Sequence, residues 1–248
     1  MIEIQHLMKS FNGQAVLRGV DLRIDEGENL VVIGRSGCGK SVLLKHIIGL
    51  LKPDSGKIVV DGVDIVPLNE TQLGPTRRKM GMLFQGAALF DSMTVAENIG
   101  FPLREQRNMS QGEIDGKVAE ALDIVGLAGT QKKMPSELSG GMRKRVGLAR
   151  AVIGRPKYIL YDEPTTGLDP VVADSINNLI LQLGEQFDCT AIAVTHDMKS
   201  VYKIADCVAM LHEGTILTVG TPEEIQASKD PIVQKFITGT ADPKEIEF

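Results

Sequence analysis

A glycine-rich segment at residues 34–41 limits the possible folds of this chain more than any other feature. Its sequence, Gly-Arg-Ser-Gly-Cys-Gly-Lys-Ser, fits the pattern G-x-x-x-x-G-K-[ST]. An apolar run at 30–33 precedes the segment and a helix-like stretch at 41–50 follows it, which gives the order strand, loop, helix. Backbone N–H groups of such a loop, together with the dipole of the helix N-terminus, surround phosphate oxygens. The segment therefore predicts a parallel α/β core that binds the phosphates of a nucleotide.

Individual residues of this loop have separate expected roles. Lys40 is expected to reach the terminal phosphates, and the hydroxyl of Ser41 is expected to ligate Mg²⁺. The surrounding N–H groups are expected to lower the pKa of the Cys38 thiol. The nucleotide-binding candidates in and beside the loop are Gly34, Arg35, Ser36, Gly37, Cys38, Gly39, Lys40, Ser41 and Val42.

A second motif ends another apolar run. The run at 158–161 is followed by Asp162 and Glu163, and a phosphate loop needs a carboxylate across the sheet. We expect Asp162 to hold Mg²⁺ through its water shell. Adjacent side chains of a strand point in opposite directions, so Glu163 is expected to face elsewhere and to polarise the attacking water as the general base.

The rest of the chain is arranged around these two motifs. Alternating apolar residues and an Asn12-Gly13 turn predict an antiparallel hairpin at the start, and Asp61-Gly62 predicts a second one. The pattern is helical from about 94 to 154. We expect one α/β domain, with core and antiparallel β residues at 1–90 and 155–238, an inserted helical subdomain at 91–154 and a polar tail at 239–248.

Composition excludes some classes of function. The net charge of −5 gives no general attraction to phosphate backbones, so we expect no nucleic-acid partner. Two basic clusters, at 77–79 and 143–145, are interpreted as solvated helix faces. No apolar run reaches the about 20 residues that a membrane-spanning helix needs. If the protein serves a membrane, a partner is expected to supply the spans.

A third motif makes the combination specific. Leu138-Ser139-Gly140-Gly141-Met142 precedes a helix-like run and forms a second helix N-terminus suited to an anion. With the phosphate loop before it and the Asp-Glu pair after it, the chain resembles the ATP-binding-cassette (ABC) ATPase family over nearly its whole length. The resemblance implies a RecA-like P-loop core, ATP and Mg²⁺ as cofactors, and a homodimer whose subunits face head to tail.

The family pattern also implies roles for single residues. Ser139, Gly140 and Gly141 of one subunit would contact the γ-phosphate held by Lys40 of the other. Met142 stands where the family usually has glutamine, and it cannot make an amide hydrogen bond. Asp169 matches the residue that communicates across the dimer interface.

Four further positions match the family around the nucleotide. Gln85 corresponds to the glutamine that senses Mg²⁺ and water, and His196 corresponds to the switch histidine at the γ-phosphate. Phe11, in place of the usual tyrosine, corresponds to the aromatic residue that stacks on adenine, with Val16 beside it.

The segment at 86–99 is where subfamilies differ. Together with Met142 it resembles the ATPases of Mla-type phospholipid transporters. That resemblance implies membrane permease subunits that contact the region from Gln85 to Ile99 and a lipid-binding partner of the MCE (mammalian cell entry) family. It also implies a peripheral location on the cytoplasmic face of the bacterial inner membrane. The motor of a polar-solute importer, such as one for amino acids, and a soluble ABC ATPase of iron–sulfur assembly share the catalytic motifs and stay open as alternatives.

Overall fold

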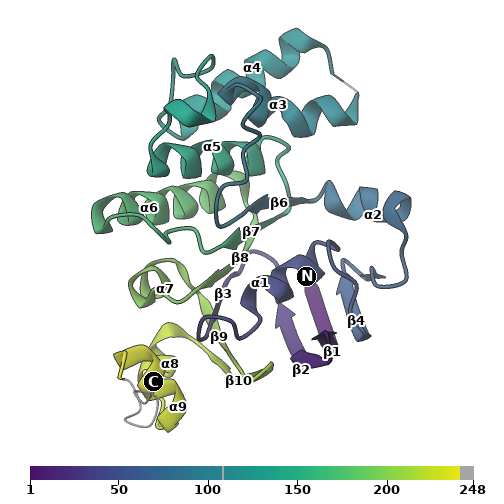
Figure 1. Ribbon diagram of the computed structural model, residues 1–248, viewed down its shortest axis with the longest axis vertical. Coiled ribbons are helices and arrows are strands. Elements are labelled where there is room, and N and C mark those ends of the chain that lie inside the picture. Colours follow the sequence, from purple (N-terminus) through teal and green to yellow (C-terminus); the bar gives the residue numbers. More distant parts are fainter. Residues whose placement is uncertain (108, 241–248) are drawn as a thin grey trace.

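The computed structural model describes residues 1–107 and 109–240 and contains two sheets (Figure 1). The larger sheet has the order β10-β9-β3-β8-β7-β6, and all neighbours from β9 to β6 are parallel. Only β10, at one edge, runs antiparallel to its neighbour. Its strands are β3 (Asn29–Ile33), β6 (Met80–Leu83), β7 (Tyr158–Asp162), β8 (Thr190–Thr195), β9 (Cys207–His212) and β10 (Thr215–Gly220).

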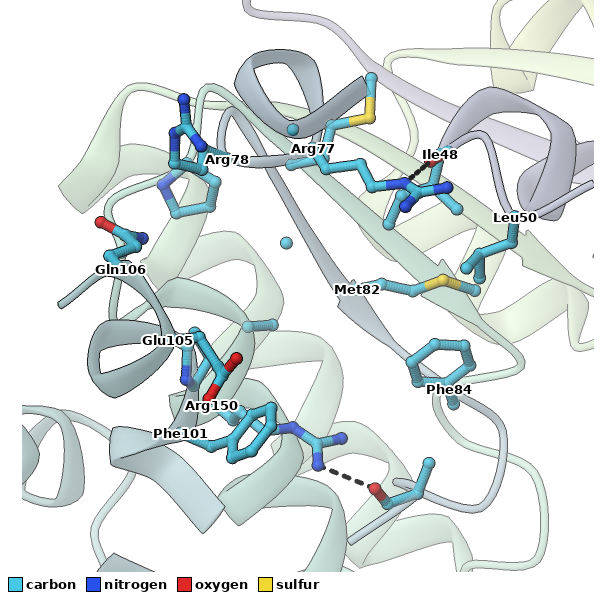
Figure 2. Close-up of a pocket in the computed structure, with 18 of the residues that line it drawn as sticks. Ile48, Leu50, Arg77, Arg78, Met82, Phe84, Phe101, Glu105, Gln106 and Arg150 are labelled. Carbon is cyan, nitrogen blue, oxygen red and sulfur yellow. Dashed lines mark hydrogen bonds between the residues drawn. The ribbon is translucent and has the colours of Figure 1, made fainter. Parts of the chain in front are cut away.

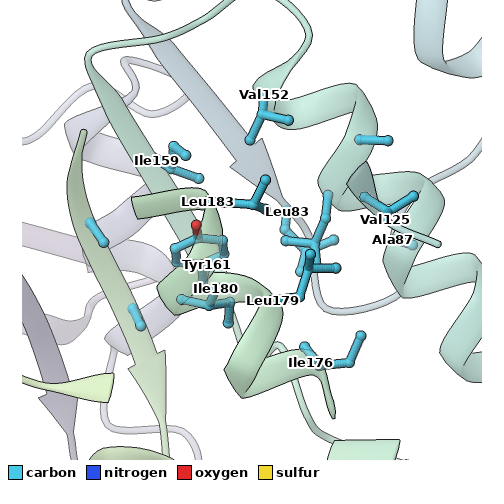
Figure 3. Packing of buried hydrophobic residues seen from close by; sticks show 14 of the residues in the cluster. Leu83, Ala87, Val125, Val152, Ile159, Tyr161, Ile176, Leu179, Ile180 and Leu183 are labelled. Atoms are coloured by element: carbon cyan, nitrogen blue, oxygen red, sulfur yellow. The ribbon is translucent and has the colours of Figure 1, made fainter. Parts of the chain in front are cut away.

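The central strands are buried on both faces, which explains why they are apolar without alternation. Ile159 and Tyr161 of β7 pack in one cluster with Ile180 and Leu183 of helix α6 (Pro170–Phe187), as Figure 3 shows. Leu160 of the same strand lies in a second cluster on the opposite face, which is shared with the smaller sheet. The sheet is therefore the middle layer of the molecule, as expected for a P-loop ATPase core.

The smaller sheet is antiparallel, with the order β2-β1-β4-β5. Both predicted hairpin turns are present, because Asn12 and Gly13 have φ of 50° and 81° and Asp61 and Gly62 have φ of 48° and 80°. Positive φ at both central residues is what the type I′ turn of a two-residue hairpin requires. The strands are β1 (Ile2–Phe11), β2 (Gln14–Ile24), β4 (Ser55–Val60) and β5 (Val63–Asp64).

Helices fill the chain between β6 and β7 and lie together at one end of the molecule (Figure 1). Between 84 and 157 the described residues contain no strand. The elements of this stretch are α3 (Val95–Gln106), α4 (Gln111–Ile124), the short 3₁₀ helix η1 (Pro135–Glu137) and α5 (Gly140–Val152). That this stretch is a separate subdomain with boundaries at 91 and 154 remains a prediction.

The remaining helices are α1 (Lys40–Ile47), α2 (Glu70–Arg77), α7 (Met198–Ile204), α8 (Pro222–Gln226) and α9 (Pro231–Thr238). Among the residues described, none of the helices has the length and apolar character to span a membrane. The predicted polar tail is described only for Gly239 and Thr240, and the rest of it lies outside the described residues.

Helix N-termini divide into two kinds. Each α-helix from α2 to α9 begins at a residue whose side chain accepts a hydrogen bond from a backbone N–H of the first turn; these residues are Asn69, Thr94, Ser110, Ser139, Asp169, Asp197, Thr221 and Asp230. The residue before the first turn of α1 is Gly39, which has no side chain to do this. The first N–H groups of α1 therefore point toward the loop without a side-chain acceptor from their cap residue.

Candidate functional site

Four neighbouring parallel strands deliver the predicted site residues to one edge of the sheet. In the order β3, β8, β7, β6, the strands are followed by the phosphate loop, His196, Glu163 and Gln85. Ligands of open parallel sheets bind at this carboxyl edge, where the connecting loops can vary without disturbing the core. Residues that lie more than a hundred positions apart in the chain thus meet in one place.

The phosphate loop is tightly packed against the sheet. Gly34 has φ of 153°, and a Cβ atom there would lie 2.3 Å from the carbonyl oxygen of Leu211. Gly39 has φ of 108° and would bring a Cβ within 3.1 Å of Val16. Lys40 folds over the loop, because its Nζ donates to the carbonyl oxygens of Gly34 at 2.7 Å and Arg35 at 3.1 Å. The loop thus combines an uncapped helix end with a buried cation, which is a suitable environment for phosphate.

Ser41, the last residue of the loop, is in direct contact with Asp162, and both are predicted magnesium ligands. The hydroxyl of Ser41 donates to Oδ1 of Asp162 at 2.6 Å. A hydroxyl and a carboxylate are hard oxygen donors of the kind that Mg²⁺ prefers, together with waters and phosphate oxygens. The donor set therefore fits Mg²⁺.

Glu163 occupies the centre of the edge and has an unusual backbone. Its φ is 48°, a left-handed conformation that costs an ordinary side chain about 1 to 3 kcal/mol. The carboxylate lies 3.0 Å from Nδ1 of His196, accepts from Oγ1 of Thr166 at 2.9 Å and lies 3.7 Å from Nζ of Lys40. The side chain is almost fully buried, so these contacts fix its position.

The prediction that the side chains of Asp162 and Glu163 point in opposite directions is wrong. Strand alternation stops at Asp162, the last residue of β7, and the left-handed turn at Glu163 brings its carboxylate back toward the phosphate loop. Asp162 contacts Ser41, and Glu163 approaches Lys40. Both carboxylates therefore face the same loop.

Gln85 begins the connection after β6, and its side chain is exposed. Its backbone carbonyl accepts a hydrogen bond from Nζ of Lys144, which also donates to the carbonyl oxygen of Glu163 at 3.0 Å. Burial lowers the pKa of Lys144 to about 8, although Asp162 and Glu163 oppose this shift electrostatically. The interpretation of 143–145 as a solvated face is wrong for Lys144, which is 5% exposed. A run of charges does not indicate which of its members faces the core.

The third sequence motif, at 138–142, leads into α5, and Ser139 caps the start of this helix. Oγ of Ser139 accepts from the N–H of Met142 at 3.3 Å, which leaves its own O–H group available to donate. A Cβ atom at Gly141 would lie 2.6 Å from Val172 of α6. Met142 is partly buried against the core. This helix end therefore offers hydrogen-bond donors to an anion.

Asp169 has a local structural role. Its Oδ1 accepts from the N–H groups of Val171 at 3.0 Å and Val172 at 3.1 Å, so it caps α6. Val171 beside it is 79% exposed. The predicted role of Asp169 across a dimer interface remains a prediction.

The residues predicted to surround adenine differ in their surroundings. Val16 lies against the phosphate loop at Gly39. Phe11 ends β1, and Nζ of Lys9 lies 5.4 Å from the centre of its 40% exposed ring. Arg35, Ser36 and Gly37 are exposed in the loop, and Val42 is half-buried.

The expected effect of the loop on Cys38 is wrong in sign. Burial raises the pKa of the Cys38 thiol, and the opposing influence of Lys40 is smaller. Loss of contact with water therefore affects the Cys38 thiol more than the nearby N–H groups and Lys40 do.

A large groove lies beside the site, between the core and the helices α3 and α5. Its volume is about 1220 Å³. Figure 2 shows Leu50 and Phe84 on one side and Phe101 and Arg150 on the other. The rings of Phe90 and Phe101 lie 5.0 Å apart at 50°. This apolar lining with a basic rim is an opening that a helix or loop of another protein could enter.

The family model of the ABC transporters matches residues 17–166. The chain therefore belongs to the ABC transporter family, and it is an ATP-hydrolysing cassette of that family. A dimeric ATP-binding cassette, solved in a post-hydrolysis state with ADP and phosphate, superposes with a TM-score of 0.83 and is 31% identical, covering 90% of this chain and 99% of that one.

Two curated relatives are similar over almost the whole chain. The intermembrane phospholipid transport system ATP-binding protein MlaF of Haemophilus influenzae is 38% identical over 98% of this chain and 92% of its own length. A probable ribonucleotide transport ATP-binding protein of Mycobacterium leprae is 43% identical over 96% of this chain, which spans 69% of that relative.

Proposed function

We propose that this chain is the motor of a phospholipid transporter, in which Mg-ATP closes a head-to-tail homodimer and the closure drives a membrane permease. The observation that carries the proposal is the meeting of Ser41, Asp162, Glu163 and His196 at the edge of the sheet that also holds Lys40. The permease, an MCE-domain partner and a peripheral location on the cytoplasmic face of the inner membrane complete the proposal.

Each residue of the edge has a task in this cycle. The loop from Gly34 to Ser41 holds the phosphates, and Lys40 moves from the loop carbonyls to the terminal phosphate. Mg²⁺, when bound, neutralises phosphate charge, with Ser41, Asp162 and Gln85 as its proposed holders. Glu163 accepts a proton from the attacking water, because its carboxylate is already held in place by Thr166 and His196.

The proposed dimer brings a second helix end to the nucleotide. Ser139, Gly140 and Gly141 of one subunit would bind the γ-phosphate that Lys40 of the other subunit holds. The O–H group of Ser139 and the N-terminus of α5 support this role, because both offer donors to an anion. Hydrolysis cuts the bond between the γ-phosphate and ADP, and release of the phosphate then removes the charge that both subunits share, so that the dimer opens.

The substitution Glu163→Gln tests the chemistry and the dimer together. We expect ATP turnover to fall by roughly a hundredfold or more while ATP still binds, because an amide cannot accept the proton of water. Light scattering after gel filtration should then detect a dimer with Mg-ATP that disappears with Mg-ADP. Normal turnover would remove Glu163 as the base, and a monomer under all conditions would refute the dimer.

The groove beside the site is the proposed contact surface of the permease, together with the stretch from Gln85 to Ile99. The aromatic pair Phe90 and Phe101 and the rim residue Arg78 suit an amphipathic segment with an acidic end. Phe101→Ala should reduce the amount of permease that co-purifies and leave the ATPase activity of the isolated chain unchanged. Val219→Ala, at a 50% exposed position on β10, is the control. Equal recovery of permease with both variants would argue against the groove.

The cargo is the least constrained part of the proposal. The MlaF relative supports phospholipid, whereas the mycobacterial relative supports a polar solute, the ribonucleotide of its name. Affinity purification from native membranes in mild detergent, followed by mass spectrometry, separates the two. A permease with an MCE-domain protein and phospholipid would support lipid transport. A permease with a binding protein for polar solutes would replace the cargo and retain the motor.

A further inference from the structure

Lys144 connects two loops that come from different strands. It lies on α5, little more than one turn after Ser139, and its Nζ donates to the backbone carbonyls of Gln85 after β6 and Glu163 after β7. These two acceptors belong to the residues proposed to sense and to activate the attacking water. One buried side chain therefore joins the loop after β6 to the loop after β7 at the carboxyl edge of the sheet.

The same helix holds the loop after β6 at further points. The guanidinium group of Arg150 donates to the carbonyls of Ala87 at 2.6 Å and Ala88 at 2.8 Å. Ala87 and Ala88 have φ of 61° and 45°, which is unfavourable for alanine without such support. A Cβ atom at Gly147 would lie 2.7 Å from Leu83, so α5 also approaches the end of β6 closely. The loop at 85–88 and α5 thus form one unit.

Packing alone does not account for a lysine at position 144. A buried ammonium group loses its hydration, which costs several kcal/mol unless charge and hydrogen bonds replace it. Within the described part of the chain, Lys144 makes no ion pair closer than 4 Å, and its donors go to the two carbonyls. A methionine would fill a similar volume without that cost. The lysine is thus suited to holding these carbonyls.

We infer that Lys144 is a positioning residue that couples the two nucleotide sites of the dimer. Its contacts with Gln85 and Glu163 reach the site of its own subunit, and its helix presents Ser139 to the site of the other subunit. When the loops of Gln85 and Glu163 move at one nucleotide site, α5 moves with them and shifts Ser139 at the other nucleotide site. The inference rests on the proposed head-to-tail dimer.

Removal of the ammonium group has a defined kinetic consequence. Without Lys144, the carbonyl of Glu163 loses a donor while its backbone stays in the left-handed region, so the orientation of its carboxylate becomes less fixed. Lys40 and the phosphate loop are not touched. We therefore expect Lys144→Met to lower kcat roughly tenfold and to change the KM for ATP by less than about twofold. Lys144→Arg, which keeps a charged donor, should recover part of the lost kcat.

Dimers of two differently tagged full-length copies separate coupling from a local effect. One copy carries Lys40→Ala, so that only the site built on Lys40 and Glu163 of the other copy works. Lys144→Met is then placed in the working copy or in the disabled copy. In the disabled copy, Lys144 reaches the working site only through α5 and Ser139. We expect kcat to fall in both cases.

Controls make each outcome decisive. Lys132→Met changes an exposed lysine and should leave kcat unchanged. A melting temperature equal to that of the parent dimer would exclude misfolding of Lys144→Met. If Lys144→Met fails to fold, kcat and KM are measured for Lys144→Gln in its place. Unchanged kcat with Lys144→Met in the disabled copy would overturn the coupling, provided that Glu163→Gln forms its ATP-dependent dimer. Absence of that dimer would instead overturn the proposed function, and the inference with it.

Discussion

The hydroxyl of Ser41 donates a hydrogen bond of 2.6 Å to the carboxylate of Asp162, although 121 positions separate the two residues in the sequence. The contact joins the first turn of α1 to the end of β7. It places two oxygen donors together beside the loop that is proposed to hold the phosphates. The pair is therefore the part of the site on which metal dependence should rest.

Ser41→Ala should reduce ATPase activity at low Mg²⁺ much more than at high Mg²⁺, because one of the oxygen donors is lost. Activity measured across a Mg²⁺ titration, with Ser92→Ala as an exposed control, tests this. We expect the half-saturating Mg²⁺ concentration to rise roughly tenfold in Ser41→Ala alone. An unchanged titration curve would remove the hydroxyl from the metal site.

Gly34→Ala should abolish nucleotide binding. The added Cβ would lie 2.3 Å from the carbonyl oxygen of Leu211, a backbone atom that cannot move aside cheaply. The loop has to shift, and the N–H groups that surround phosphate shift with it. Titration with a fluorescent ATP analogue measures the loss.

Gly112→Ala is the matched control, because a Cβ there meets no atom within 4 Å. It lies in α4, where alanine is favoured over glycine, so binding should be unchanged and stability slightly higher. Normal binding by Gly34→Ala would mean that the close approach to Leu211 is not required.

Asp61→Asn should destabilise the protein in a pH-dependent way. Burial would raise the pKa of Asp61, but hydrogen bonds from Lys79, Tyr158 and Lys157 outweigh it and hold the pKa well below the ordinary value. Because the pKa of Asp61 is lower in the folded protein than in the unfolded chain, ionised Asp61 stabilises the fold at every pH above its unfolded-state pKa of about 4. This contribution is lost as the pH falls from that value toward the pKa of the folded state. The wild-type protein should therefore exceed Asp61→Asn in unfolding free energy by on the order of 2 kcal/mol at pH 7.

Urea unfolding at pH 7 and pH 3 checks this prediction. The difference between wild type and Asp61→Asn should shrink at the lower pH, whereas Asp91→Asn, at an exposed position, should have little effect at pH 7. A difference that is constant with pH would indicate lost packing instead of lost charge.

Tyr161→Phe should leave stability unchanged or raise it by about 1 kcal/mol, because a buried hydroxyl without a partner costs free energy. Among the described residues, the Tyr161 hydroxyl has no hydrogen-bond partner, and burial raises the pKa of its phenol. Tyr158 lies on the same strand, and its hydroxyl donates to Asp61 at 2.6 Å. Thermal unfolding should therefore show a loss for Tyr158→Phe and none for Tyr161→Phe. A large loss at position 161 would reveal a partner for that hydroxyl.

Much of this fold follows from local pattern. The turns at Asn12-Gly13 and Asp61-Gly62, the phosphate loop and the apolar strands are each specified by a few adjacent residues, and the structure contains them all. The α/β fold class and the membership in the ABC family were predicted from motifs whose spacing reflects the shared edge of the sheet. Such features need no knowledge of what packs against them.

What the sequence could not reveal depends on tertiary contacts. Lys144 stands in a basic cluster that is otherwise compatible with a solvated helix face, and only the packing of α5 on the loop after β6 makes it a buried donor. The left-handed turn at Glu163 likewise has no local signature such as glycine. The pKa of Cys38 was misjudged for the same reason, since burial is a property of the assembled loop.

Because Gly39 offers no side-chain cap, acceptors for the first N–H groups of α1 have to come from a bound ligand or from water. A ligand that binds only the folded form raises stability with the logarithm of its concentration. Bound phosphate would supply the acceptors that the other helices carry in their own sequences. The free energy of unfolding is thus expected to rise with nucleotide concentration, and the first turn of α1 is the part of the helix that bound phosphate stabilises directly.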